Sequence, residues 1–197
     1  MPTVTSNNID IAYDEYGSPG DPALLMVMGL GLPCSAWPPE FIEMLVEEGL
    51  RVIVFDNRDI GLSQRFDAAG MPNLFVESLR RNFGFSVRAP YALTDMMQDT
   101  AGVLNALDIQ SAHVVGISMG GYVALALWEL RPEMVRTLTL LDTKAAADTI
   151  EAKAGRQTLM DRLLAEGRAP IAGELTDALL APNPSPLVRA RLRSMVE

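Results

Sequence analysis

A hexapeptide with one serine among glycines, Gly-Ile-Ser-Met-Gly-Gly at residues 116–121, constrains the fold of this chain more than any other feature. It overlaps the end of an apolar run, Ala112–Ile117, and the start of a pattern with apolar residues at helical spacing, Met119–Leu130. A chain that reverses from a strand into a helix over so few residues forces the serine into a strained backbone conformation. Glycines beside it are then needed, because a Cβ there would collide with neighbouring backbone. The motif therefore predicts a strand, a sharp turn at Ser118 and a helix.

The predicted turn also indicates a chemical role for Ser118. The serine is expected at the carboxyl edge of a sheet, and the helix that begins at Met119 offers N–H groups to a developing oxyanion. A phosphate-binding loop and an ordinary strand-to-helix turn are the alternatives. The phosphate loop is disfavoured, because the chain has neither a Walker lysine nor Gly-x-Gly-x-x-Gly spacing. We interpret Ser118 as a catalytic nucleophile.

A second glycine-containing loop, Met-Gly-Leu-Gly-Leu at residues 28–32, follows the apolar run at residues 23–28. Carboxyl ends of parallel strands meet at one edge of a sheet, so this loop is expected beside Ser118. The backbone N–H groups of Leu30 and Met119 would then converge as an oxyanion hole. By itself, Gly-x-Gly after a strand is equally typical of an ordinary turn.

An apolar pocket for an acyl group is expected next to this serine. The residues expected to line it or to contact substrate are Gly29, Leu30, Leu32, Trp37, Met119 and members of the segment 74–85. Each apolar side chain in this set is equally plausible as a core residue.

Strand and helix patterns alternate along the first three quarters of the chain. A hairpin is predicted at residues 3–16 around Asn7 and Asn8, and strands covered on both faces at 23–28, Arg51–Phe55, Ala112–Ile117 and Val135–Leu141. Helices are predicted at 38–48, 93–107 and Met119–Leu130. This alternation is typical of an α/β fold with a mostly parallel, doubly wound sheet and flanking helices. The segment 64–92 is expected to be a long loop that borders the site.

The pattern changes near residue 143, which we take as a domain boundary. Residues 1–143 are expected to form the α/β core, and residues 144–197 a helical segment. Helices are predicted there at 148–166, 171–180 and 187–196.

Charge and composition exclude several classes of function. Sixteen basic residues against 25 acidic ones give a net charge of −9, which disfavours nucleic acid and anionic membrane surfaces as partners. No window approaches 18 uninterrupted apolar residues and no signal-peptide pattern is present, so a cytoplasmic location is expected. One cysteine, Cys34, and one histidine leave no cluster for zinc and no intrachain disulfide.

Four blocks of the sequence resemble the α/β-hydrolase superfamily in order and spacing. They are residues 27–31, 55–63, 89–96 and 112–121, the last being its nucleophile elbow. The likeness is strongest to small bacterial ester hydrolases of the aclacinomycin-methylesterase type. It implies a Ser-His-Asp/Glu triad that needs no cofactor, an acyl-serine intermediate, a small apolar ester substrate and a helical cap after the sixth strand, which residues 144–197 would begin. Met28 stands where the family often has histidine before the oxyanion-hole glycine.

The chain departs from that family in one important way, because no histidine follows Ser118. The family order is serine, acid, histidine. His113 is expected on the opposite face of the same strand, roughly 16 Å away, so it is interpreted as a packed strand residue.

Four other charged residues near predicted strand ends have structural interpretations. Asp142 stands where some members carry the triad acid, but it is interpreted as a strand-end turn residue. Asp56, Arg58 and Asp59 are interpreted as residues that tie a strand-to-loop turn together.

Two accounts of the missing base remain open, beside a third alternative in which the chain is an unrelated α/β binding protein. In the first, the chain is part of a longer hydrolase, whose further portion supplies the acid and histidine and covers the open sheet edge at Val135–Leu141. In the second, it is a short protein without a triad that binds a ligand, acts as a scaffold or forms a homodimer. Under either account, these 197 residues alone are expected to have negligible esterase turnover.

Overall fold

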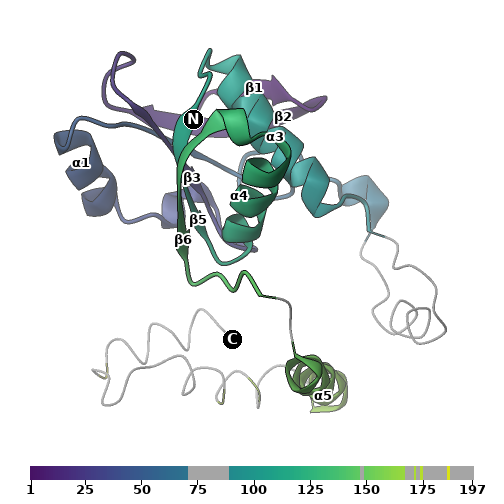
Figure 1. Ribbon diagram of the computed structural model, residues 1–197. Coiled ribbons are helices and arrows are strands. Elements are labelled where there is room, and N and C mark those ends of the chain that lie inside the picture. Colours follow the sequence, from purple (N-terminus) through teal and green to yellow (C-terminus); the bar gives the residue numbers. More distant parts are fainter. Residues whose placement is uncertain (71–88, 147–148, 167–170, 172–173, 175–185, 187–197) are drawn as a thin grey trace. The chain divides into compact units, whose positions relative to one another are not determined.

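The computed structural model describes residues 1–70, 89–146 and 149–166, together with the single positions 171, 174 and 186. The chain divides into two compact units, Met1–Ala145 and Ala146–Glu197. The first unit contains a six-stranded sheet in the order β1-β2-β4-β3-β5-β6, with helices on both faces (Figure 1). The predicted α/β class with a mostly parallel sheet is therefore confirmed.

The sheet combines an antiparallel hairpin with four parallel strands. The hairpin consists of β1 (Thr3–Ser6) and β2 (Ile9–Tyr16), and β2 also pairs antiparallel with β4. Its turn residues Asn7 and Asn8 have φ values of 49° and 63°, a region that asparagine tolerates. The parallel strands are β3 (Ala23–Val27), β4 (Arg51–Phe55), β5 (Ala112–Ile117) and β6 (Val135–Leu141).

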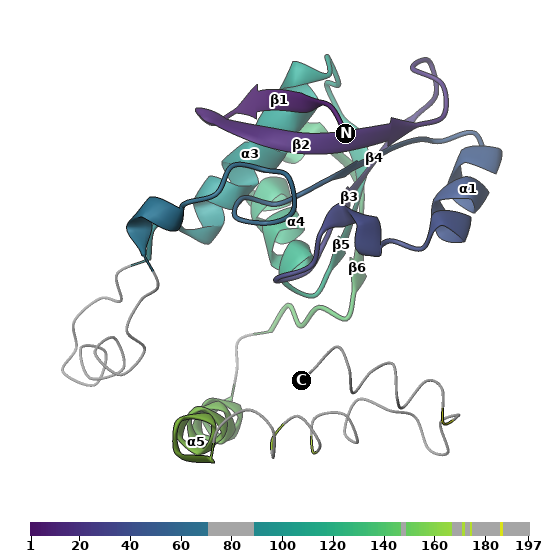
Figure 2. The same cartoon turned by 180° about the vertical axis from the view of Figure 1, so that it is seen from behind.

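The helices lie where right-handed crossovers place them. The chain passes from β3 through α1 (Pro39–Glu47) to β4, then returns through α3 (Leu93–Ala106) to β5 on the other side of β3. Two right-handed crossovers that move in opposite directions along a sheet place their helices on opposite faces of it. Accordingly, α1 covers one face, and α3 and α4 (Met119–Leu130) cover the other (Figures 1 and 2). The strand order reverses at β3, so the carboxyl ends of β3 and β5 border the switch point where such sheets bind ligands.

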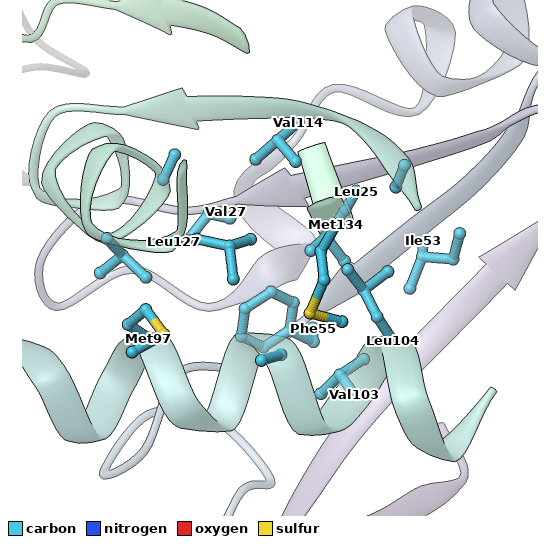
Figure 3. Packing of buried hydrophobic residues seen from close by; sticks show 14 of the residues in the cluster. Leu25, Val27, Ile53, Phe55, Met97, Val103, Leu104, Val114, Leu127 and Met134 are labelled. Atoms are coloured by element: carbon cyan, nitrogen blue, oxygen red, sulfur yellow. The ribbon is translucent and has the colours of Figure 1, made fainter. Parts of the chain in front are cut away.

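Alternate residues of the central strands enter two separate cores. On the α3 and α4 face, Phe55 packs with Leu25 and with Leu104 of α3 in the larger cluster (Figure 3). On the α1 face, Met26 and Val54 pack in the smaller cluster. The strands are apolar at consecutive positions because both of their faces are buried.

The strand β6 differs from this expectation. Its residues are half-buried or exposed and none is fully buried, and among the described strands it pairs with β5 alone. The prediction that this strand is covered on both faces is therefore wrong for the described part of the chain. The physical reason is its position at the edge of that sheet.

Shorter elements and the second unit complete the described chain. The 3-10 helices are η1 (Cys34–Ala36), η2 (Asp67–Ala69) and η3 (Pro132–Met134). In the second unit, α5 (Ile150–Glu166) carries Arg162, which forms ion pairs with Glu166 and Glu174 at 3.2 and 2.8 Å. The helix predicted at 187–196 and the lining segment 74–85 lie outside the described residues, as do most of the helix predicted at 171–180 and most of the predicted loop 64–92. No helix in the described ranges has the length and apolar character needed to cross a membrane.

Candidate active site

Ser118 occupies a sharp turn between β5 and α4. Its φ of 53° and ψ of −117° lie outside the strand and helix regions, and its side chain is exposed. The predicted strand, turn and helix are therefore present with the predicted bounds. A non-glycine residue with positive φ stores strain, and surrounding contacts must hold it.

The glycines around Ser118 allow α4 to approach the sheet closely. A Cβ at Gly116 would lie 2.5 Å from Gly120 O, and a Cβ at Gly120 would lie 2.1 Å from Val27 O. Both distances are far below van der Waals contact with backbone. Glycine at these positions thus lets the first turn of α4 rest against β5 and the end of β3.

Hydrogen bonds from the end of β6 fix the backbone of Ser118. The Ser118 N–H donates to Leu141 O at 2.9 Å, and Ser118 O accepts from Gly121 N at 3.1 Å. Thr143 Oγ1 lies 3.1 Å from Ser118 O and 3.0 Å from Leu141 O, so its proton can serve either carbonyl. These contacts hold the strained turn in place.

The loop after β3 lies directly beside Ser118. The register of β3 and β5 pairs Val27 with Gly116, and an ideal Cβ at Gly29 would lie 3.4 Å from Ser118 Cβ and 3.9 Å from its Oγ. Leu30 is 74% exposed, and its N–H donates no hydrogen bond to any described residue. The structure therefore brings the two glycine-containing loops together, while convergence of the Leu30 and Met119 N–H groups stays a prediction.

Two buried side chains after β4 hold the ends of this loop. Asn57 Nδ2 donates to Met28 O at 3.0 Å, and Asp56 Oδ1 accepts from Cys34 N at 2.7 Å. The other oxygen of Asp56 accepts from Leu62 N at 2.8 Å. The structural interpretation of Asp56 agrees with these contacts, whereas the role of Asn57 was not predicted.

Arg58 and Asp59 anchor the segments that flank this turn. Arg58 forms a two-point ion pair with Asp99 at 2.6 and 2.7 Å, and both side chains are almost fully buried. The Arg58 guanidinium also lies over the rings of Phe66 and Tyr91, 5.4 and 5.1 Å from their centroids. Burial, followed by a hydrogen bond with Asp59, raises the pKa of Tyr91 to about 12. These residues have the structural role expected of them.

The residues predicted to line the acyl pocket separate into two groups. Leu32 is 42% exposed on the loop after Gly29, and Met119 is half-buried against the larger core. Trp37 is buried in the smaller core, which is the alternative position considered for it. Cys34 is a buried free thiol in the same cluster, and burial, followed by the charge of Asp56, raises its pKa to about 12.

The lone histidine and the strand-end aspartate have local structural contacts. His113 Nδ1 lies 2.8 Å from Thr137 Oγ1 on the neighbouring strand, as expected of a packed strand residue. Asp142 has a φ of 46° immediately after β6, which fits its interpretation as a turn residue. Within the described ranges, no three histidine, cysteine or carboxylate side chains are grouped so that they could hold a metal.

Comparison with known proteins agrees with this architecture. The family model described as alpha/beta hydrolase fold matches residues 22–187. The rhodomycin D methylesterase DauP of Streptomyces sp. (strain C5) is 33% identical over 143 residues, which cover 72% of this chain and 42% of that protein. A putative carbamate hydrolase RutD of Azorhizobium caulinodans is 32% identical over 148 residues, which cover 75% of this chain and 46% of that protein.

A solved structure is similar to this chain in its three-dimensional fold. A thermophilic esterase from Thermogutta terrifontis superposes with a TM-score of 0.67 and 30% identity, covering 99% of this chain and 65% of that one. The chain thus spans less than half the length of the two curated relatives and about two thirds of this esterase.

Proposed function

Because the chain belongs to the α/β-hydrolase fold family, we propose that it carries the nucleophile of a serine hydrolase that cleaves carboxylic esters. The observation that carries this proposal is the exposed Ser118 at a positive-φ turn, with Gly29 packed against it. In this reaction Ser118 Oγ attacks the ester carbonyl, and the alcohol leaves to give an acyl-serine that water hydrolyses. No cofactor takes part in this sequence of steps.

The backbone N–H groups of Leu30 and Met119 are proposed to stabilise the oxyanion. Each donor of this kind lowers the barrier by about 3 kcal/mol. The exposed position of Leu30 and the packing of Gly29 against Ser118 support this assignment. Leu32 is proposed to contact the apolar part of the substrate, since it lies exposed on the same loop.

A small apolar ester is favoured as substrate over a carbamate. The named activities of the similar proteins include both a methylesterase and a putative carbamate hydrolase. Both reactions begin with attack on a carbonyl, but an ester carbonyl is more electrophilic and makes fewer demands on a weakly activated serine. Paired p-nitrophenyl esters and carbamates distinguish the two classes.

The triad acid and histidine are proposed to come from residues outside this sequence. His113, the only histidine of the chain, contacts Thr137, and it lies on β5, five residues before Ser118. This observation also favours the second candidate function, a catalytically inactive module of this fold that binds a ligand or a partner. In that case a homodimer would cover the edge of the described sheet at β6, whereas a further portion of chain would cover it in a longer hydrolase.

Labelling with a serine-directed phosphonate tests the proposal. In the full-length protein the reagent should modify Ser118, and Ser118→Ala should abolish both labelling and ester hydrolysis. Ser111→Ala is the matched control, because Ser111 stands at the opposite end of β5. Absence of labelling at Ser118 in folded full-length protein would exclude the hydrolase and favour the inactive module.

The 197-residue chain by itself should hydrolyse a short-chain p-nitrophenyl ester barely above background. An oxyanion hole and binding without a base give roughly 10³- to 10⁴-fold over water. Robust turnover that Ser118→Ala removes would show that another group of this chain supplies the base.

A further inference from the structure

The Thr143 hydroxyl connects the chain after β6 to the backbone of Ser118. Its Oγ1 lies 3.1 Å from Ser118 O and 3.0 Å from Leu141 O. The Leu141 carbonyl already accepts the Ser118 N–H at 2.9 Å, and the Ser118 carbonyl already accepts the Gly121 N–H at 3.1 Å. The hydroxyl can therefore give the Ser118 carbonyl a second hydrogen-bond donor, which comes from outside helix α4.

Gly121 makes room for this hydroxyl. A Cβ at Gly121 would overlap Thr143 Oγ1 and would lie 2.7 Å from Thr143 Cβ. The half-buried side chain of Thr143 is thus packed directly against the first turn of α4. Any larger residue at position 121 would displace the threonine from the Ser118 carbonyl.

The Ser118 carbonyl belongs to the same peptide group as the Met119 N–H. This group is planar and trans, so its C=O and N–H point in opposite directions. Fixing the carbonyl beside Thr143 therefore fixes the Met119 N–H so that it points away from Thr143. Met119 is the first residue of α4, and its N–H has no acceptor within the helix. This N–H can therefore donate to a substrate.

Thr143 and the loop that carries the other proposed oxyanion donor lie on opposite sides of β5. The sheet order places β6 and β3 on either side of β5, and Thr143 follows β6 whereas Leu30 follows β3. Rotation of the peptide between Ser118 and Met119 would instead aim a carbonyl oxygen at the substrate, and its partial negative charge would repel an oxyanion. Because Ser118 has a strained φ of 53°, surrounding contacts must prevent this peptide from relaxing.

We propose that Thr143 is a positioning residue for the oxyanion hole, because its hydroxyl holds the Ser118 carbonyl and thereby keeps the Met119 N–H aimed at the oxyanion. This role rests on the proposed ester hydrolysis at Ser118, and it requires no contact between Thr143 and the substrate. The oxyanion exists only after attack on the ester carbonyl. Loss of the hydroxyl should therefore weaken stabilisation of the transition state more than binding of the substrate.

Hydrolysis of a short-chain p-nitrophenyl ester by the full-length protein tests this role. Thr143→Val removes the hydroxyl and keeps the branched shape of the side chain. Loss of a whole oxyanion donor lowers kcat by about 10²- to 10³-fold. The Gly121 N–H still holds the carbonyl in this variant, so kcat should fall about 10- to 100-fold while KM changes less than about threefold.

Two further variants separate the hydroxyl from a general effect on the fold. Thr143→Ser retains the hydroxyl and should recover kcat to within about threefold of the parent protein. Thr139→Val is the matched control, because it makes the same change at an exposed position of β6 and should leave kcat and KM unchanged. If Thr143→Val does not fold, Thr143→Ala replaces it, since alanine removes the hydroxyl without placing a methyl group against the two carbonyls.

A short-chain alkyl trifluoromethyl ketone gives a second measurement that depends on the oxyanion. Ser118 Oγ adds to its carbonyl carbon, the C=O electron pair moves onto the oxygen, and the hydroxyl proton passes to the general base. Its inhibition constant should rise in Thr143→Val by about the factor by which kcat/KM falls.

The outcomes distinguish this role from the proposed function. Unchanged kcat in the folded valine or alanine variant, a change in KM alone, or failure of Thr143→Ser to restore kcat would overturn the role of Thr143 and leave ester hydrolysis at Ser118 intact. A parent protein without hydrolysis that depends on Ser118 would overturn both.

Discussion

Replacing Gly120 with alanine tests whether the close approach of α4 to β3 creates the turn at Ser118. An ideal Cβ at Gly120 lies 2.1 Å from Val27 O and 2.7 Å from Met28 O, whereas ordinary contact begins at 3.4 Å. The start of α4 would therefore have to move away from the sheet by about 1 Å. Both neighbours are backbone atoms at the end of a central strand, so no side chain can rotate to make room.

The expected loss follows from two opposing contributions. Overpacking against rigid neighbours costs about 3 kcal/mol or more, while alanine gains at most about 1 kcal/mol over glycine in a helix. The free energy of unfolding should thus fall by at least about 2 kcal/mol. Gly20→Ala is the control in the same unit, because a Cβ at Gly20 meets no atom within 4 Å. That change should be neutral or stabilising by up to about 1 kcal/mol.

Urea unfolding followed by circular dichroism measures both variants against the parent chain. The midpoint should fall for Gly120→Ala and stay equal or rise for Gly20→Ala, with similar slopes. If Gly120→Ala were as stable as Gly20→Ala, helix α4 could not be pressed against β3, and the packing explanation for the strained Ser118 would be refuted.

Three further predictions concern the residues that support the site. Arg58→Met should lower the free energy of unfolding, measured in urea, by about 3–5 kcal/mol, because it leaves the Asp99 carboxylate buried without its ion-pair partner. Adding Asp99→Leu should recover most of that loss. No recovery in the double variant would contradict the ion-pair argument. Asn57→Ala should lower the free energy of unfolding by about 1–3 kcal/mol by leaving Met28 O without its donor, and an unchanged urea midpoint would show that this bond contributes little. For Cys34, burial and then the charge of Asp56 raise the pKa from 9.0 to about 12. Its contribution to stability should be full below about pH 9 and decline toward pH 12, because the unfolded thiol ionises first. The free energy of unfolding should fall less steeply with rising pH for Cys34→Ala than for the parent chain. Parallel curves for the two chains would exclude this linkage.

Local patterns in the sequence were sufficient to predict the bounds of several strands of the sheet and of the helix after Ser118. The strands Arg51–Phe55, Ala112–Ile117 and Val135–Leu141 and the helix Met119–Leu130 have their predicted bounds. Apolar runs and helical spacing are properties of neighbouring residues, so they can be read along the chain. The turn at Ser118 was predictable for the same reason, because its strand, its glycines and its helix are contiguous.

Contacts between residues far apart in the sequence could be found only from the tertiary structure. Thr143 contacts Ser118 across 25 residues and Asn57 contacts Met28 across 29, and no local pattern specifies either pair. Trp37 was equally plausible in the acyl pocket or in the core, and the position of α1 over the sheet determined that it is buried. The sequence by itself determined the elements, the turn at Ser118 and the absence of a histidine after it. Only the folded chain decided which distant residues support that turn and which strand lies at the edge of the described sheet, because both depend on how the elements pack.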